Sequence, residues 1–441
     1  MRRNGKNELT SHPFEKGIYS GPMSVPIIVK ILVSLALILI GNKLLKNLSV
    51  AVALATVVLA LWSGHTIERM GEIALERFFS IDNGLLLVVI IMVIWLSSQM
   101  DRTGIMRDLV GSLRAFLSPR SAMAVLPAVI GLLPMPGGAL FSAPLVDDCD
   151  EQNEVPPLTK SQINYWFRHV WELTWPLYPG VILATDIAGL EVWQVFLVGV
   201  PMMGASVAAG YFFILRKARI SSGHTTPSKH RFLHMMLPIF TVIAVYIMII
   251  IIFPQVGEFN KYLPMLIGIA AAIVVLQIKR PLPWSEWRQI LFSRRAVSMG
   301  VIVALIRVYG AFIEARLPGG TMLMEQMRLE LNALGIPLIL LIMILPFISG
   351  LTTGISVGFV GASLPIAFSL LSPDAGLAER LGTLMLTYPF GFIGVMLSPV
   401  HVCFIVTSEH FKTSLIKSMG RILTPAAIVL VVSFAIGMLL L

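Results

Sequence analysis

The sequence ILPFISGLTTGISVGFVGASLP, residues 344–365, is strongly apolar and yet carries helix-breaking residues at its centre, which makes it the most informative part of the chain. Gly and Pro interrupt helices, and small hydroxyl side chains can satisfy the backbone groups that an interruption frees in lipid. The stretch AVIGLLPMPGGALFSAPLV, residues 128–146, has the same character. We therefore expect a re-entrant hairpin, which enters and leaves a membrane by the same side, over 121–146 and another over 336–372.

The composition places these hairpins in a membrane protein. Of the 441 residues, 56% are hydrophobic and only 13% are charged. Soluble domains carry about 25% charged residues, so this chain has too few polar side chains to coat a soluble surface. We exclude a soluble enzyme, a coiled coil and a disordered chain. The formal net charge of +9 then indicates positive cytoplasmic loops rather than a nucleic-acid partner.

The apolar segments repeat along the chain. Pro134 precedes Pro176 by 42 positions, and Pro346 precedes Pro389 by 43. Each half contains three spans, a hairpin, a broken span and a final span, so each crosses the membrane an odd number of times and the second half is inverted. Inverted repeats with broken helices are typical of secondary transporters. The predicted fold is an all-α membrane protein with about ten transmembrane helices and two re-entrant hairpins, in two inverted-topology repeats.

These halves give the domain boundaries. We expect a polar tail at 1–24, a first repeat at 25–216, a cytoplasmic linker at 217–231 and a second repeat at 232–441. The broken helices cover 162–189, interrupted at Trp175–Gly180, and 379–407, interrupted at Tyr388–Gly391 and at Ser398–Pro399. With the N-terminus outside, the inner loops hold roughly twice as many Lys and Arg residues as the outer ones, as the positive-inside rule requires. We therefore place both termini outside; an interfacial helix in the basic tail stays open.

Three strings carry a resemblance to a known family: GLLPMPGGALFSAPLVD (131–147), INYWFRHVWELTWPLYPG (163–180) and LSPVHVCFIVTSEHF (397–411). Over 25–441 the chain resembles an uncharacterised prokaryotic integral-membrane family, domain of unknown function four hundred and one, of the ion transporter superfamily. That superfamily is similar in plan to divalent-anion/sodium symporters, gluconate permeases, sodium/proton antiporters and arsenite efflux proteins. The resemblance implies an inner (plasma) membrane location, a homodimer as a common state, and a site between the hairpin tips and the broken helices.

The interruptions point to the residues of that site. A half-helix offers free N–H groups to an anion at one end and free carbonyls to a cation at the other, and hydroxyls add further oxygen ligands. The candidates for binding a solute or ion are Pro136, Gly137, Gly138, Tyr178, Ser349, Gly350, Thr352, Thr353, Gly354, Ser356, Tyr388, Ser398 and His401. The alternative is that the small residues among them serve close helix packing.

Charged residues inside apolar segments are costly and tend to mark function. His169 and Glu172, just before the first interruption, are the candidates for proton coupling. Arg168 stands four positions before Glu172, so a purely architectural pair is the alternative. Arg307 lies within the span 296–315 and is a candidate partner for an anion, or else part of a structural salt bridge.

The other polar groups are interpreted as architecture. Cys149 and Cys403 read as small apolar residues, the acidic loop Asp147–Glu151 as a solvated loop, and Asp186 as a group in water near the outer end of its span. The nucleotide-binding motif GxxxxGK[ST] and the metalloprotease motif HExxH are absent from the sequence. We expect no catalytic residue and no metal site, hence no enzyme.

The expected function is secondary active transport of a small solute, an organic anion by preference, coupled to H⁺ or Na⁺ by alternating access. An exporter or cation/proton antiporter on the same fold is the first alternative. A membrane-embedded lipid-processing enzyme is the less favoured one, because the second acidic cluster that it needs is missing. No cofactor is expected besides the coupling ion, and the expected partners are the lipid bilayer and the solute, without nucleic acid.

Overall fold

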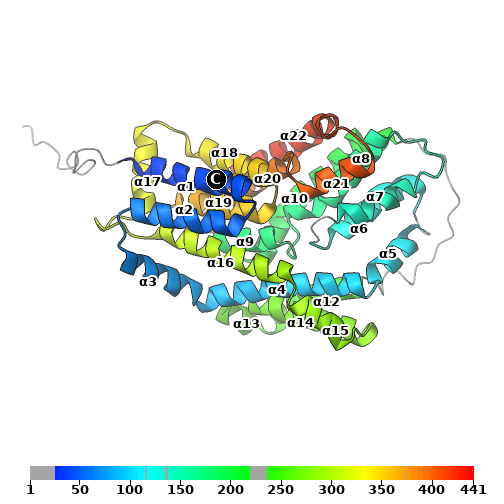
Figure 1. Cartoon of the computed structure of the whole chain (residues 1–441), viewed down its shortest axis with the longest axis horizontal. Helices are drawn as coiled ribbons and strands as arrows, with labels where there is room; N and C mark the ends of the chain where they lie inside the picture. Colours follow the sequence, from blue (N-terminus) through cyan, green and yellow to red (C-terminus); the bar gives the residue numbers. More distant parts are fainter. Residues whose placement is uncertain (1–24, 115–116, 135–137, 219–235, 373) are drawn as a thin grey trace, which may run out of the picture.

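The computed structural model describes residues 25–114, 117–134, 138–218, 236–372 and 374–441 (Figure 1). Within these ranges the chain is nearly all helical and contains no β-strand, which confirms the predicted all-α class. The predicted tail at 1–24 lies outside the described residues, and so does the predicted linker except for 217–218.

The first half follows the predicted apolar segments closely. Its helices are α1 (Ile27–Leu45), α2 (Leu48–Trp62), α3 (Ile67–Phe78), α4 (Ile81–Arg102), α5 (Ile105–Arg114), α6 (Pro119–Gly131), α7 (Ala139–Asp147), α8 (Pro157–Arg168), the 3-10 turn η2 (Val170–Leu173), α9 (Pro179–Ile187), α10 (Val192–Phe213) and the 3-10 turn η3 (Leu215–Lys217). Polar caps set several starts: the Ser80 hydroxyl accepts the backbone N–H of Asn83 at 3.3 Å at the start of α4. The helix α3 buries only Ile73, so it is a surface helix that the apolar pattern did not predict.

The second half is built in the same way. Its helices are α12 (Leu237–Ile252), α13 (Pro254–Phe259), α14 (Leu263–Lys279), α15 (Trp284–Leu291), α16 (Arg294–Glu314), α17 (Leu323–Ala333), α18 (Leu338–Thr353), α19 (Ser356–Ser369), α20 (Leu377–Met396), α21 (Val402–His410) and α22 (Leu415–Leu440). The long helix α16 lies between α2 and α4 in Figure 1 and packs against both. Because α2 and α4 come from the first half, the two halves share one interior.

Several of these helices are long and apolar enough to cross a membrane. Among the described residues five qualify: Ile27–Leu45, Ile81–Arg102, Val192–Lys217, Trp284–Glu314 and Leu415–Leu440. A sixth is added if α17 and α18, bent by 114°, form one broken span. The helices α2, α12, α14 and α19 are apolar but shorter. A helix of 15 residues, such as α2, is only about 22 Å long against a hydrocarbon core of about 30 Å.

Both predicted hairpin segments fold as two helices that pack against each other, α6 with α7 and α18 with α19. In the second, α18 ends at Gly354, whose φ of 66° is the left-handed conformation that favours glycine. A Cβ on Gly354 would also lie 3.1 Å from the backbone nitrogen of His401. The tip of this hairpin therefore sits directly on the second broken helix.

The second broken helix has one of its two predicted interruptions. We expected interruptions at Tyr388–Gly391 and at Ser398–Pro399, but α20 runs unbroken from Leu377 to Met396 with Pro389 inside it. Proline at 389 leaves the carbonyl of Met385 without its helical N–H donor. The Ser433 hydroxyl on α22 donates to that carbonyl, so the helix tolerates the proline. The interruption falls at 397–401 alone.

Candidate functional site

The two interrupted helices meet at their interruptions. The first consists of α8, η2 and α9, with residues 174–178 between η2 and α9, and the second consists of α20 and α21. The Tyr165 hydroxyl on α8 donates to the carbonyl of Met396 at the end of α20, at 2.9 Å. The Tyr388 hydroxyl on α20 donates to the carbonyl of Glu172 in η2, also at 2.9 Å. Residues more than 200 positions apart in the chain thus surround one place.

Two imidazole rings and a carboxylate form the centre of this place. His169 Nε2 lies 3.1 Å from His401 Nε2 and 3.9 Å from Glu172 Oε1. The Ser356 hydroxyl, in the first turn of α19, donates to Glu172 Oε2 at 3.3 Å. His169 is 1% exposed and His401 8%, so both imidazole rings are buried. We call His169, Glu172 and His401, with Arg168 and Cys403 described below, the central cluster.

Arg168 brings a positive charge to the central cluster. Its Nη1 atom lies 3.7 Å from Glu172 Oε1, and the residue is only 2% exposed. The tip of the first hairpin leaves room for it, because a Cβ on Gly138 would overlap the guanidinium group. The Tyr178 hydroxyl donates to the carbonyl of Gly131, at the end of α6. Each hairpin tip therefore contacts the interrupted helix of its own half.

Cys403 completes the central cluster, and the sequence analysis missed it. Its thiol interacts by hydrogen bonding with both His169 and His401, and the residue is 4% exposed. Sequence reasoning treated it as a small apolar residue because it stands alone in an apolar helix. The one available signal was its place two positions after His401. That spacing indicates a cluster only once the fold places His169, which is distant in the sequence, beside His401 and Cys403.

Of the predicted hydroxyl groups of α18, those of Thr352 and Thr353 bond within their own helix, whereas the buried hydroxyl of Ser349 has no hydrogen-bond partner among the described residues. The Thr353 hydroxyl donates to the carbonyl of Ser349 at 2.7 Å, and that of Thr352 donates to Ile348 at 2.8 Å. A Cβ on Gly350 would overlap the carbonyl of Gly391, so this glycine serves the close packing of α18 on α20.

Of the remaining predicted residues, some make contacts at the tip of the second hairpin and others fall outside the described part of the chain. The Ser398 hydroxyl donates to the carbonyl of Leu351 at 2.7 Å and ties the second interruption to the second hairpin. Gly354 offers its carbonyl to His401 Nδ1 at 2.7 Å. Pro136 and Gly137 fall outside the described residues.

Arg307 faces an anion that belongs to the protein itself. Its Nη1 atom lies 2.5 Å from Asp186 Oδ2. Lys261 Nζ lies 3.3 Å from the other carboxylate oxygen, to which the Tyr262 hydroxyl also donates. The interpretation of Asp186 as a group in water is wrong, since the residue is 7% exposed and anchors α9 to α16 and α14. The sequence hid this pair because Arg307 and Asp186 are far apart along the chain.

The acidic loop is also less solvated than predicted. Asp150 is 2% exposed, and its carboxylate accepts the backbone N–H groups of Glu154 and Val155 at 2.9 and 3.0 Å. Lys160 Nζ lies 2.9 Å from Asp150 Oδ2 and 3.0 Å from Asp147 Oδ1. The loop is thereby fastened to the start of α8.

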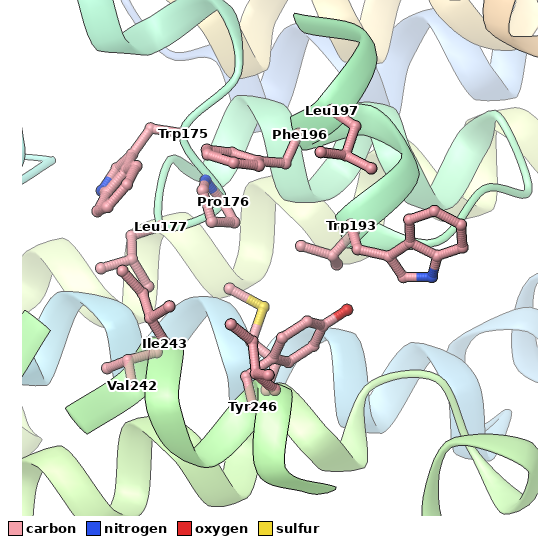
Figure 2. Close-up of a pocket in the computed structure, with 12 residues that line it drawn as sticks. Trp175, Pro176, Leu177, Trp193, Phe196, Leu197, Val242, Ile243 and Tyr246 are labelled. Atoms are coloured by element: carbon pink, nitrogen blue, oxygen red, sulfur yellow. The ribbon is translucent and has the colours of Figure 1, made fainter. Parts of the chain in front are cut away.

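An apolar cavity of about 290 Å³ adjoins the first interruption. Figure 2 shows it between the interruption and α10 on one side and α12 on the other. Its lining includes Trp175, Pro176, Leu177, Trp193, Phe196, Leu197, Val242, Ile243 and Tyr246. Such a wall suits an acyl chain better than a hydrated ion or a carboxylate. The central cluster is therefore the better candidate for a polar solute.

The protein is thus helical, with several helices long and apolar enough to cross a membrane and with a buried cluster of ionisable side chains where two interrupted helices meet. The chain belongs to a family described as a protein of unknown function, DUF401, whose model matches residues 28–440. This confirms the family resemblance of the sequence. No curated protein matches the chain.

Proposed function

We propose that the protein is a secondary active transporter of a small organic anion, driven by a gradient of H⁺ or Na⁺, with the central cluster as its solute site. The observation that carries the proposal is the burial of Arg168, His169, Glu172 and His401 at the meeting point of two interrupted helices. Buried ionisable groups in membrane proteins are expensive and mark solute or ion pathways. Interrupted helices at such a point are the usual site of secondary transporters.

The charge around the central cluster favours an anion. Arg168 lies within it, and Arg295 is near enough for the two guanidinium charges to repel each other. Arg295 also donates to the carbonyl of Pro134, beside the first hairpin tip. Glu172 is the one carboxylate among the members of the central cluster, so one further negative charge would balance the two arginines. Asp101 also interacts electrostatically with Arg295 and offsets part of this excess.

The proposed membrane arrangement is that of the ion transporter superfamily. It has about ten crossings in two inverted repeats, with α6–α7 and α18–α19 as re-entrant hairpins. The short apolar helices α2, α12 and α14 would cross in a locally thinned bilayer or with their flanking residues completing the span. Both termini lie outside an inner membrane in this proposal. Labelling single cysteines placed at 63–80 from either side of the membrane tests it, since we expect modification from outside only.

The test of function is uptake by proteoliposomes. Purified protein is reconstituted, and a panel of labelled mono- and dicarboxylates is offered under an imposed H⁺ gradient, an imposed Na⁺ gradient, or neither. We expect gradient-dependent accumulation of at least one carboxylate. Accumulation only of cations would favour the antiporter alternative, and turnover of a lipid without any gradient would contradict transport altogether.

Glu172→Gln is the sharpest variant for this test. The amide keeps an oxygen for the Ser356 hydroxyl but removes the one negative charge of the central cluster, in a site where screening by water is weak. We expect uptake to fall by at least about tenfold while the protein remains folded. Glu72→Gln, on the exposed surface of α3, is the matched control and should transport like the wild type. Normal uptake by Glu172→Gln would exclude the central cluster as the site.

A further inference from the structure

Two backbone carbonyls fix which nitrogen of each central histidine carries a proton. His169 Nδ1 lies 2.5 Å from the carbonyl oxygen of Tyr165, and His401 Nδ1 lies 2.7 Å from that of Gly354. A carbonyl oxygen can only accept a hydrogen bond, so Nδ1 is the protonated nitrogen in both rings. In the neutral rings each Nε2 atom then carries a lone pair and no proton.

These two lone pairs face each other. The Nε2 atoms are 3.1 Å apart, and the Cys403 thiol interacts with both rings. All three potential ligand atoms lie within 4.8 Å of one another, and all three residues are buried. If all three groups are neutral, the thiol proton is thus the only proton shared among His169 Nε2, His401 Nε2 and Cys403 Sγ. Such an excess of lone pairs around one point calls for a cation.

We propose that His169, His401 and Cys403 form a binding site for a transition-metal ion of the Zn²⁺ class. Two imidazole nitrogens and a thiolate sulfur are the ligand types that Zn²⁺ prefers, at about 2.0–2.1 and 2.3 Å. Two nitrogens bound at a tetrahedral angle lie about 3.3 Å apart by that geometry, close to the 3.1 Å seen here. The ion binds with loss of the thiol proton to solvent.

The surroundings of the three ligands fit a metal site in two further respects. Histidine ligands almost always donate their second N–H to a carbonyl or carboxylate, as both rings do here. Glu172 Oε1, 3.9 Å from His169 Nε2, is near enough to become the fourth ligand after a small movement. The thiolate and this carboxylate offset the charge of the ion beside Arg168.

Such a site would join the two halves of the chain. His169 follows α8 in the first interrupted helix, whereas His401 and Cys403 belong to the second. An ion bound to all three raises the stability of the folded protein by linkage, since the unfolded chain does not hold these ligands together. The inference goes beyond the transport proposal and does not depend on it, because metal binding can be measured without any solute.

The experiment is a titration of purified, metal-free protein with Co²⁺ followed by displacement with Zn²⁺. We expect one ion per chain, visible tetrahedral Co²⁺ bands and a thiolate-to-Co²⁺ charge-transfer absorption, all removed by Zn²⁺. We also expect Zn²⁺ to raise the unfolding temperature. The absence of Co²⁺ bands in the wild-type protein, at a pH where the thiolate can form, would overturn the proposal; carboxylate uptake measured on the same preparation shows whether transport stands without the metal.

Matched variants distinguish Co²⁺ binding at this site from nonspecific Co²⁺ binding elsewhere on the protein. Cys403→Ser should abolish the charge-transfer absorption, and His401→Gln should weaken Co²⁺ binding by more than about tenfold, the least that even outer partners of metal sites contribute. Cys149→Ser and His65→Gln remove another buried cysteine and another buried histidine, and should bind Co²⁺ like the wild type. Equal loss in these controls, or an unchanged spectrum in Cys403→Ser, would contradict the assignment.

Discussion

Two arginine–carboxylate pairs among the described residues have little exposure to solvent, and they differ in geometry. Arg307 and Asp186 approach to 2.5 Å, and Lys261 and Tyr262 occupy the other carboxylate oxygen. Arg168 and Glu172 stay 3.7 Å apart. The first pair has partners on both carboxylate oxygens, whereas the charges of the second pair stay beyond hydrogen-bonding distance of each other.

We interpret the first, closed pair as part of the architecture and the second, spaced pair as part of the proposed solute site. A closed pair offsets the cost of burying its own charges and fixes the helices that carry it, as the Arg307–Asp186 pair fixes α16 against α9. In the spaced pair, other groups, among them His169 and Ser356, complete the surroundings of Glu172. Under the transport proposal a bound solute or ion would complete them further. The burial of charges therefore indicates a site only together with their geometry and with their place where two interrupted helices meet.

The largest effect that we expect follows from opening the closed pair. Asp186→Leu leaves the mostly buried Arg307 guanidinium without its carboxylate, and breaking a buried pair costs up to about 3–5 kcal/mol. Adding Arg307→Met should recover most of that loss, because both charges are then gone. The measurement is the unfolding temperature in detergent for both single variants, the double variant and the wild type.

The same cycle on Arg168→Met and Glu172→Gln tests the comparison itself. Since their charges are farther apart, the coupling between these two changes should be smaller than that between Asp186→Leu and Arg307→Met. An equal coupling would mean that the spaced pair is also architectural, and the central cluster would lose its distinction.

A second effect, of intermediate size, comes from the hairpin tip that keeps the spaced pair in place. A Cβ on Gly131 would overlap the carbonyl of Arg168, so Gly131→Ala must push α6 and α8 apart. We expect a stability loss of about 1–3 kcal/mol, the usual cost of overpacking, together with reduced uptake. Gly204→Ala, where a Cβ meets nothing within 4 Å, is the control. It should gain up to about 1 kcal/mol from helix propensity, and a similar gain in Gly131→Ala would show that the tip does not hold Arg168.

Much of this architecture could be predicted from the sequence because it depends on local composition. Continuous apolar runs specify helices, and Gly354 or the 174–178 segment interrupts them through backbone chemistry that is visible in the residues themselves. Pro389 shows the limit of that reasoning. Whether a proline interrupts a helix depends on a donor for the freed carbonyl, and the donor here is Ser433, which comes from another helix.

The central cluster could be predicted only in part, for the same reason. The sequence predicts His169, Glu172, Ser356 and His401, because polar residues beside interruptions are costly in lipid. Nothing local distinguishes Cys403 from a small apolar residue, or shows that Arg307 is taken by Asp186. Both depend on which helices meet. The absence of a local metal motif likewise carried no information, since the two histidines lie 232 positions apart.

The smallest effect concerns a third ion pair, at the edge of the fold, where Asp150 holds Lys160 at 2.9 Å. Burial alone would raise the pKa of Asp150, but the hydrogen bonds from Lys160 and from the N–H groups of Val155 and Glu154 outweigh it and lower the pKa below the usual 3.8. A carboxyl group whose pKa is lower in the folded protein stabilises that protein at pH values above the unfolded pKa of about 3.9. This contribution is lost as the pH falls toward the folded pKa.

The wild type should therefore unfold at a higher temperature than Asp150→Asn at neutral pH, and this difference in unfolding temperature, the gap, should narrow only below about pH 4. Glu151→Gln, at an exposed neighbouring position, should show no such gap. A difference in unfolding temperature that stays constant as the pH falls would mean that Asp150 stabilises the protein by its shape and hydrogen bonds, and not by its charge. The Asp150–Lys160 pair could then not be compared with the two arginine pairs as an electrostatic interaction.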